Sequence, residues 1–285
     1  MKRTLLIDAD IYCYKHSSRN ESVFYFDGKD NPPAVEHDTQ AACEGALEDI
    51  ESIRKKLDAD RIIICLTDRE QPFRKEIYPD YKGNRTSRKP EDLFRVEAFL
   101  KERYEFYRRD GLEADDCMGI LSTHPTIVPG EKIIVSEDKD MQTIPGLLFN
   151  PRKDDDVRKV SRLQADRFHM VQTITGDQTD HYPGAVGIGP DSPEVSTVNT
   201  AKTVKEMWQA VRCAYIRSSR KADMSAYRRT YGKSKKAMAL FDFKANLVAI
   251  ETRAVIQARC ARILRASDWN FAERKPILWV PPRID

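Results

Sequence analysis

Short apolar runs that end in acidic residues recur along the first half of the chain. The runs lie at 5–7, 61–66 and 132–135, and the acids that follow them are Asp8, Asp68, Asp138 and Asp140. Continuous apolar runs of this length are typical of parallel strands that are covered on both faces. Because active sites of parallel α/β sheets lie at the carboxyl ends of the strands, the pattern predicts an acidic site at one edge of a sheet.

Helical periodicity alternates with these runs. Ala42, Ala46, Ile50 and Leu57 share one helical face, and Thr39 is the expected N-cap. Further strands are expected at 105–108 and 147–149, and further helices at 114–121 and from Pro90 onward. Strands and helices in alternation predict an α/β fold with a mostly parallel central sheet flanked by helices.

The strand pattern stops near residue 161, and the rest of the chain is predominantly helical. We therefore expect an α/β core at 1–160 and a helical region at 161–285, packed on the core as one unit. A length of 285 residues is sufficient for either one large domain or two small ones.

Composition restricts the class of protein only weakly. Lys and Arg number 48 against 45 Asp and Glu, so a net charge of +3 indicates neither a strongly basic nor a strongly acidic protein. Six cysteines without a Cys-x-x-Cys pair indicate reduced thiols, and no apolar run is long enough to span a bilayer. With no signal peptide, the sequence predicts a soluble, cytoplasmic protein that does not bind a membrane.

Nine carboxylates occupy positions that one α/β fold would bring together. They are Asp8, Asp68, Glu113, Asp115, Asp116, Asp138, Asp140, Asp177 and Asp180. Such a group repels itself unless cations neutralise it, and an all-oxygen donor set favours Mg²⁺ or Mn²⁺ over zinc. Taken singly, 113–116 also fits an N-capped helix and 138–140 a solvated turn.

Positive charge and aromatic rings are interleaved between Phe73 and Lys89. The cations are Arg74, Lys75, Lys82, Arg85, Arg88 and Lys89, and the rings include Tyr78 and Tyr81. Cations that reach phosphates beside rings that stack on bases are typical of single-strand binding, although a solvated charged face is the other interpretation.

A glycine-rich string, 184–189, follows the last acid pair. Gly184, Gly187 and Gly189 allow a tight hairpin whose N–H groups approach a phosphate backbone, although many such strings are plain loops. Farther on, 217–236 is strongly basic and is either a second phosphate-contacting surface or a solvated segment.

The strings LIDAD, PDYKGNR, GLEADD, SEDKD and GDQTDHYPGAVGIG together resemble the 5′ nuclease (flap endonuclease) superfamily. The chain is most similar to the 5′→3′ exonucleases of short-tailed bacteriophages. The resemblance implies a core with a helical arch at about 70–105, followed by a helix-two-turn-helix region with a duplex-binding hairpin. It also implies two Mg²⁺ or Mn²⁺ ions per active site.

The resemblance assigns roles to individual residues. It places the inner ion on Asp8, Asp68, Glu113 and Asp115 with help from Asp116, and the second ion near Asp138, Asp140, Asp177 and Asp180. It places Lys82 and Arg85 on the scissile phosphate, and Tyr81 where a ring stacks on a base. It implies K⁺ at the hairpin, but Pro190 to Glu194 departs from the family pattern and shortens or displaces the next helix. The family varies at Asp10.

The implied function is hydrolysis of DNA from 5′ ends, nicks or flaps to 5′-phosphate products. RNA in RNA–DNA hybrids is an expected second substrate, in phage replication and primer removal, by a monomer in the host cytoplasm. A PIN-type ribonuclease shares the acidic sheet edge. A haloacid-dehalogenase phosphatase would use Asp8 of Asp8-Ala9-Asp10 as nucleophile. A non-enzymatic DNA-binding protein is the third alternative, but without metals its clustered acids would repel DNA.

Overall fold

The computed structural model describes residues 2–26, 33–235, 238 and 241–284. The chain forms two compact units. The first contains Met1–Phe73, Thr86–Val160 and Ile263–Ile277, and the second contains Arg74–Arg85, Ser161–Arg262 and Leu278–Asp285. The main division falls between residues 160 and 161, but 74–85 and 263–277 belong to the unit opposite to the one expected from the sequence.

A six-stranded sheet forms the centre of the first unit, in the order β5-β4-β1-β6-β7-β8. Its strands are β1 (Arg3–Asp8), β4 (Arg61–Cys65), β5 (Glu105–Tyr107), β6 (Glu131–Val135), β7 (Gly146–Phe149) and β8 (Arg158–Val160). All neighbours pair in parallel except β7 and β8, which are antiparallel. In register, Asp8 lies beside Cys65 of β4 and Ile7 beside Val135 of β6. The carboxyl ends of the three apolar runs therefore meet at one edge.

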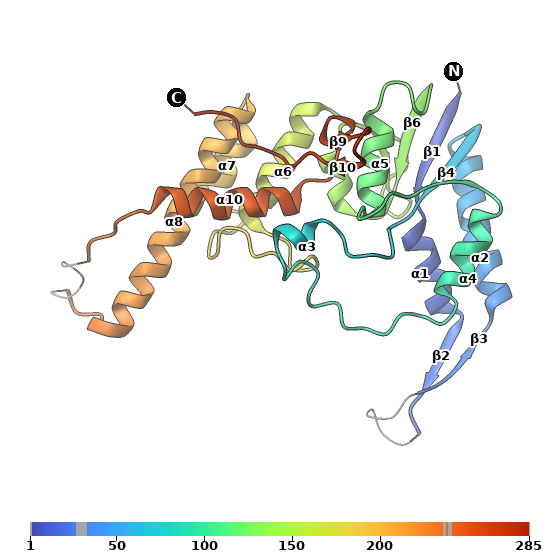
Figure 1. Cartoon of the computed structure of the whole chain (residues 1–285), viewed down its shortest axis with the longest axis horizontal. Helices are drawn as coiled ribbons and strands as arrows, with labels where there is room; N and C mark the ends of the chain where they lie inside the picture. Colours follow the sequence, from blue (N-terminus) through green and yellow to red (C-terminus); the bar gives the residue numbers. More distant parts are fainter. Residues whose placement is uncertain (1, 27–32, 236–237, 239–240, 285) are drawn as a thin grey trace. The chain divides into compact units, whose positions relative to one another are not determined.

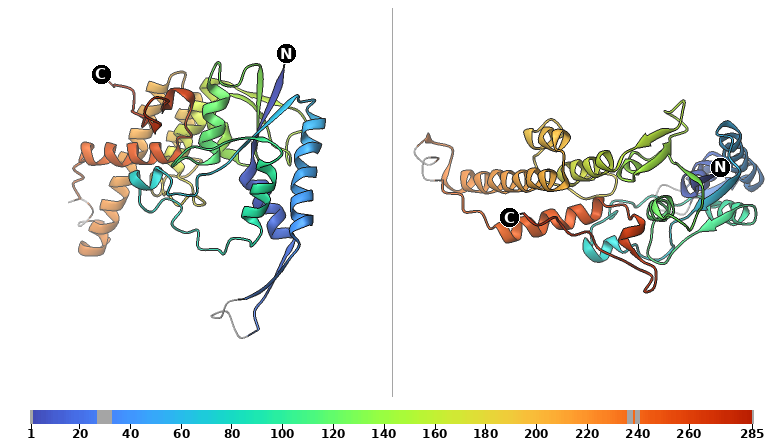
Figure 2. Two further views of the ribbon diagram at one scale, coloured as in Figure 1. Left: turned by 45° about the vertical axis from the view of Figure 1, so that its right-hand side comes forward. Right: turned by 90° about the horizontal axis from the view of Figure 1, so that it is seen from above.

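Helices cover both faces of this sheet (Figure 2). They are α1 (Ala9–Arg19), α2 (Thr39–Lys56), α4 (Leu93–Lys101) and α5 (Ala114–Thr123). The first three pack together with Leu5 and Ile7, whereas α5 contacts β1, β4 and β6 outside that cluster. Successive side chains of a strand point to opposite faces, so each apolar run contributes to the packing on both faces of the sheet.

Two short antiparallel pairs were not expected from the sequence. One joins β2 (Glu21–Phe24) to β3 (Ala34–His37), and the other joins β9 (Trp269–Asn270) to β10 (Lys275–Pro276). The predicted N-cap of α2 was wrong by one residue, because the Asp38 carboxylate accepts the Ala41 N–H. Asp precedes the helix here, and Thr39 is its first residue.

The expected arch region contains little helix. Between α3 (Arg74–Ile77) and α4 the stretch 78–92 has no regular secondary structure. The chain passes along this stretch from the second unit to the first. The structure also contains two 3₁₀ helices, η1 (Lys139–Thr143) and η2 (Ala266–Asp268).

The second unit is helical, as expected. Besides α3 it contains α6 (Arg162–Thr175), α7 (Pro193–Thr200), α8 (Val204–Tyr231) and α10 (Leu247–Ala261). Its core surrounds Trp208, which is fully buried between α6, α7 and α10. Helix α7 is only 8 residues long and begins at Pro193 behind a Ser192 cap, as the prolines predict. Within the described residues, no helix is long and apolar enough to cross a membrane.

Candidate metal centre and nucleic-acid interface

Asp8 lies at the carboxyl end of β1 and is 4% exposed. The Ser136 hydroxyl, just beyond β6, donates a hydrogen bond of 2.9 Å to Asp8 Oδ2. The same hydroxyl oxygen accepts the Asp138 N–H at 3.1 Å. Ser136 therefore holds the two adjacent acidic strand ends together.

The electrostatics of Asp8 are those of a carboxylate among like charges. Burial, followed by the charges of Asp10 and Asp138, raises the pKa of Asp8 from 3.8 to about 7, against the lowering effect of hydrogen bonds from Ser136 and the Ile11 backbone. A divalent cation bound beside Asp8 would relieve this repulsion and favour the charged form of the carboxylate.

Asp10, for which the family varies, lies in the same acidic cluster. Its carboxylate accepts the Thr67 N–H at 3.1 Å. Burial raises the pKa of Asp10, hydrogen bonds from Thr67 lower it, and the charges of Glu97 and Glu113 raise it further. The sequence signal for Asp10 was its position two residues after Asp8, at the start of the helix that follows β1. No sequence signal pointed to Glu97, Thr67 or Ser136 as neighbours of this site.

The sequence left open whether the acids at 113–116 bind a metal or cap a helix, and the structure shows a capping role for two of them. Glu113 and Asp116 form a capping box, and fully buried Asp116 accepts the N–H groups of Glu113 at 3.3 Å and Leu264 at 3.0 Å. Asp116 therefore anchors backbone as well as being a predicted ligand. Burial and Cys117 raise the pKa of the Cys65 thiol, with further contributions from Asp8, Asp10 and Asp115, so Asp115 lies near the strand ends.

Other predicted ligands of the first unit are held by backbone. Asp68 accepts the N–H groups of Gly111 at 2.8 Å and Arg69 at 2.9 Å. Asp138 accepts the N–H of Asp140 at 2.8 Å. These bonds fix where the carboxylates lie before any ligand arrives.

Over the residues that the structure describes, no group of three or more His, Cys, Asp or Glu side chains is arranged as a ready-made metal site. The donor chemistry nevertheless fits a hard divalent cation, because the clustered acids offer oxygen only and already raise the pKa of Asp8. The nine-ligand assignment, Asp140 included, stays a prediction.

The second unit contains the other predicted acid pair. Asp177 is 6% exposed, and its Oδ1 accepts the N–H groups of Thr179 at 2.7 Å and Asp180 at 3.1 Å. This turn directs Asp180 toward the segment 74–85, where its carboxylate meets three predicted functional side chains. It accepts the Tyr81 hydroxyl at 2.8 Å and Arg85 Nη2 at 3.0 Å, and lies 3.4 Å from Lys82 Nζ.

The structure thus brings predicted catalytic cations and a predicted metal ligand together. Lys82 is further fixed by its backbone N–H, which donates to the Asp180 carbonyl at 2.9 Å. Its side chain is 15% exposed, while that of Arg85 is 54% exposed. Negative charge that arrives here would meet two cations already oriented by one carboxylate.

Two predicted DNA contacts were wrong. Tyr81 is 2% exposed and packs against Tyr182, so its ring is not available to stack on a base. Arg74 is also 2% exposed, and its guanidinium donates to the carbonyls of Cys260 at 3.1 Å and Arg262 at 2.6 Å. Arg74 therefore binds the end of α10 rather than phosphate.

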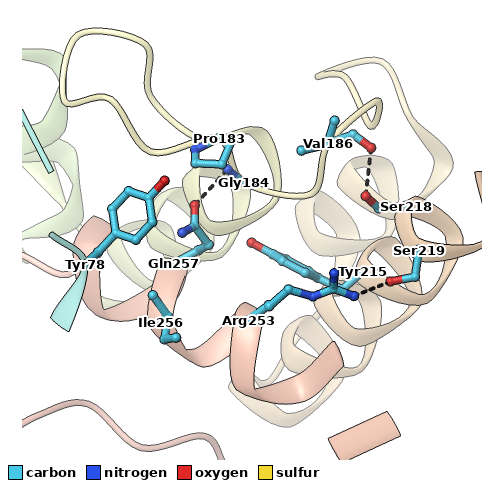
Figure 3. A pocket seen from close by; sticks show the side chains of 10 residues that line it. All are labelled: Tyr78, Pro183, Gly184, Val186, Tyr215, Ser218, Ser219, Arg253, Ile256 and Gln257. Carbon is cyan, nitrogen blue, oxygen red and sulfur yellow. Dashed lines mark hydrogen bonds between the residues drawn. The ribbon is translucent and has the colours of Figure 1, made fainter. Parts of the chain in front are cut away.

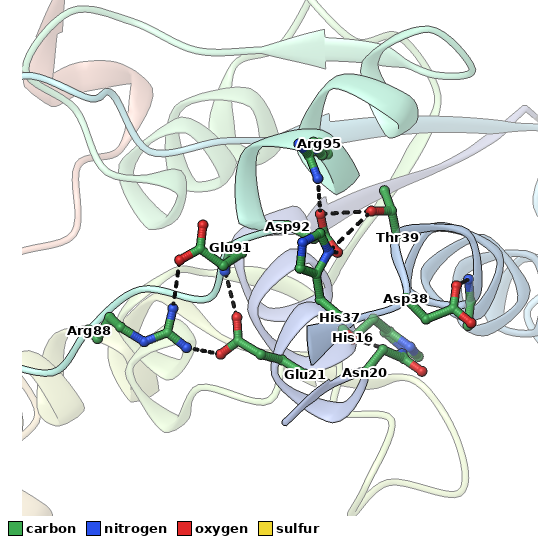
Figure 4. A network of polar contacts seen from close by, with 11 residues as sticks. His16, Asn20, Glu21, His37, Asp38, Thr39, Arg88, Glu91, Asp92 and Arg95 are labelled. Atoms are coloured by element: carbon green, nitrogen blue, oxygen red, sulfur yellow. Dashed lines mark hydrogen bonds and ion pairs between the residues drawn. The ribbon is translucent and has the colours of Figure 1, made fainter. Parts of the chain in front are cut away.

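The remaining cations of this segment lie at the surface. Lys75 is partly buried and Lys89 is exposed, with its ammonium over the Phe94 ring. Arg88 forms ion pairs with Glu21 of the β2–β3 hairpin and with Glu91 (Figure 4).

The same network ties the start of α4 to the first unit. Asp92 accepts hydrogen bonds from Thr39 and Arg95 and lies 2.7 Å from His37 Nδ1. The basic segment is therefore anchored where it returns to the sheet.

The glycine-rich hairpin is held by α8 and α10. The Gly184 N–H donates to Gln257 Oε1 at 2.8 Å beside a cavity of about 230 Å³ (Figure 3). The Ser218 hydroxyl donates to the Val186 carbonyl, and the Lys221 ammonium to the Gly187 carbonyl, both at 2.7 Å. A Cβ added at exposed Gly189 would meet no atom within 4 Å.

Comparison with known proteins identifies the chain. Residues 3–148 match the family described as "5′-3′ exonuclease, N-terminal resolvase-like domain". An exodeoxyribonuclease of Enterobacteria phage T3 is 30% identical over 247 residues, which is 84% of this chain and 79% of the relative. The chain belongs to the 5′-3′ exonuclease family. An exonuclease of Escherichia phage T7 is 32% identical over 251 residues, which is 84% of this exonuclease and 80% of the relative.

Solved structures show the fold. A flap endonuclease of bacteriophage T5, solved with DNA and metal ions, covers 93% of this exonuclease and 89% of its own chain, at 14% identity and a TM-score of 0.52. A T5 protein co-crystallised with metal ions covers 91% of both chains, at 15% identity and a TM-score of 0.51. The resemblance, the fold class and the assignment as a 5′→3′ nuclease, a phosphodiester hydrolase, are confirmed.

Proposed function

We propose that this exonuclease is metal-dependent and that its divalent ions, two Mg²⁺ or Mn²⁺, bind at the acidic sheet edge. The observation that carries the proposal is the pair of acidic strand ends joined by Ser136, buried Asp8 and Asp138, where burial and like charges raise the pKa of Asp8. Asp8, Asp68, Glu113 and Asp115 would hold one ion. The second is assigned to Asp138, Asp140, Asp177 and Asp180, and Asp116 would assist the first.

When bound, such ions activate water and stabilise the attacking and leaving oxygens of an in-line displacement at phosphorus. The chain contributes the geometry around them. Ser136 holds Asp8 beside Asp138, and Thr67 orients Asp10 while its hydroxyl accepts the Ala114 N–H at the start of α5. No side chain acts as a covalent nucleophile in this proposal.

Lys82 and Arg85 would stabilise charge that develops on the non-bridging oxygens of the scissile phosphate. Their pairing with Asp180 supports this role, because it orients both cations before substrate binds. A phosphate would then share these cations with Asp180. Because the two side chains are already ordered, less free energy is needed to orient them when the phosphate binds.

The substrate would be DNA with a 5′ end, nick or flap, and the names of relatives, an exodeoxyribonuclease and flap endonucleases, support DNA ends and flaps. We extend it to RNA in RNA–DNA hybrids, and to primer removal in phage replication by a cytoplasmic monomer. The hairpin glycines 184, 187 and 189 would approach the duplex, and Lys75, Arg88 and Lys89 would contact phosphates. K⁺ at the hairpin is part of the same proposal, and the Lys221 ammonium, which donates to the Gly187 carbonyl, lies at the same hairpin.

One assay tests the proposal. A 5′-labelled nicked or flapped duplex should be cut only when Mg²⁺ or Mn²⁺ is present, and chelator should stop the reaction. Asp115→Ala should abolish most cleavage while DNA binding stays measurable, whereas the exposed control Asp156→Ala should cut normally. Wild-type turnover by Asp115→Ala at saturating Mg²⁺ would refute the ligand assignment. Cutting of single-stranded RNA alone would favour the PIN-type ribonuclease.

A further inference from the structure

The second half of α8 buries none of its side chains fully. Buried side chains of α8 lie between Met207 and Tyr215, and the described residues 216–231 contribute none. Figure 1 shows this half extending past α10 within the second unit. Most helices in proteins are stabilised by burying an apolar face. Residues 216–231 bury no side chain fully, so packing does not explain why this sequence is helical.

Its charge pattern is one-sided. Residues 216–231 contain five cations, Arg217, Arg220, Lys221, Arg228 and Arg229, and a single acid, Asp223. A solvated helix is usually supported by opposite charges at i,i+4, whereas Arg217 and Lys221 are like charges at that spacing. The helix dipole favours cations in the last turn, but it does not explain those three turns earlier.

These cations are available to a ligand. Arg217 is paired with Glu194 at 2.9 Å, but among the described residues no acidic side chain lies within ion-pair distance of Lys221, Arg228 or Arg229. The same three side chains, with Met224, Ser225 and Lys233, line a surface hollow of about 400 Å³. We call Lys221, Arg228, Arg229 and Lys233 the α8 ridge.

The α8 ridge begins at the glycine hairpin. Lys221 donates to the Gly187 carbonyl, and its Cδ lies 3.8 Å from where a Gly187 Cβ would be. Lys221 and Arg228 are seven residues apart, two turns along one face, a distance of roughly 10 Å. At about 3.4 Å of helix axis per phosphate, that distance covers roughly three phosphates of one strand.

We propose that the α8 ridge binds the phosphate backbone of duplex DNA and continues the contact made at the hairpin. The proposal rests on the nuclease function proposed above. It commits to a duplex because the ridge is continuous with the hairpin through Lys221, and because the residues that line the hollow include no aromatic ring on which a splayed base could stack. These phosphate contacts would increase the affinity for DNA and the length of duplex covered, but they would not select a base sequence.

The test is a charge-neutralised variant, Lys221→Gln/Arg228→Gln/Arg229→Gln, in the full chain. Its matched control removes three exposed cations elsewhere, Arg19→Gln/Lys55→Gln/Lys202→Gln. Fluorescence anisotropy in chelator measures binding to blunt duplexes of increasing length over a range of salt concentrations. Circular dichroism of both variants verifies that the helices are intact.

Loss of three phosphate contacts should reduce the slope of log K against log salt by roughly 2 to 3, and the control should keep the wild-type slope. Longer duplexes should bind the wild type more tightly than short ones, and the variant should lose that gain. A wild-type slope and length dependence in the variant would overturn the proposal, and so would a loss seen only with single strands. If the wild type neither binds nor cuts any 5′-ended nucleic acid, the proposed function fails as well.

Discussion

Asp8→Asn should stabilise the metal-free protein, and the gain should depend on pH. The pKa of Asp8 is about 7 in the fold against 3.8 as the ordinary value. The folded state therefore holds a proton that the unfolded state releases between these values, so Asp8 destabilises the fold progressively as pH rises through this window. About three pKa units at 1.36 kcal/mol each amount to roughly 4 kcal/mol above pH 7. The expected penalty is about 2 kcal/mol near pH 5.5 and under about 1 kcal/mol at pH 4.

Denaturant unfolding in chelator, followed by circular dichroism from pH 4 to pH 8, measures the difference between Asp8→Asn and wild type. Asparagine keeps the shape and can still bond to Ser136, while the charge is removed. The exposed control Asp156→Asn should alter stability by no more than about 0.5 kcal/mol at any pH. Added Mg²⁺ should stabilise wild type at pH 8 more than Asp8→Asn. Parallel pH profiles for wild type and Asp8→Asn would refute the reasoning.

Three further predictions concern the second unit. Lys82→Ala should lower the single-turnover rate about 100-fold with little loss of DNA affinity, and an equal loss in both would reduce Lys82 to a simple phosphate contact. Arg74→Met should destabilise the protein by about 3 kcal/mol in thermal or denaturant melts, because two buried carbonyls lose their donor; unchanged stability would contradict this role. Gly184→Ala should cost about 3 kcal/mol, since φ is +62° and the new Cβ would meet the Ile174 carbonyl at 2.5 Å, whereas Gly189→Ala should be tolerated.

Local patterns predicted the sheet because its central strands are apolar without interruption. The expected runs at 5–7, 61–66 and 132–135 became β1, β4 and β6, side by side and parallel. The clustering of Asp8 with Asp138 follows from that topology alone, since adjacent parallel strands end at the same edge. The β2–β3 hairpin was missed because its side chains are largely exposed and supply no apolar pattern.

The functions of single cations could not be predicted from the segment in which they lie. Arg74 and Arg85 belong to the same basic run, yet one is buried against backbone 186 residues away and the other is exposed beside Asp180. Only their tertiary contacts distinguish Arg74 from Arg85. The charge composition of the segment counts the two residues alike. The same applies to Asp116, whose partner Leu264 lies 148 residues away.

The order of segments in the two units has a consequence for dissection and for evolution. The chain changes unit at five places, after residues 73, 85, 160, 262 and 277. A fragment that stops at Val160 would lose Leu264, whose N–H is bound by Asp116, and it would retain 74–85 without the helices on which they pack. Neither unit can therefore be obtained by truncation, and a single recombination crossover cannot exchange one unit for that of a relative. Because their segments are interleaved along the chain, the two units are expected to be inherited together.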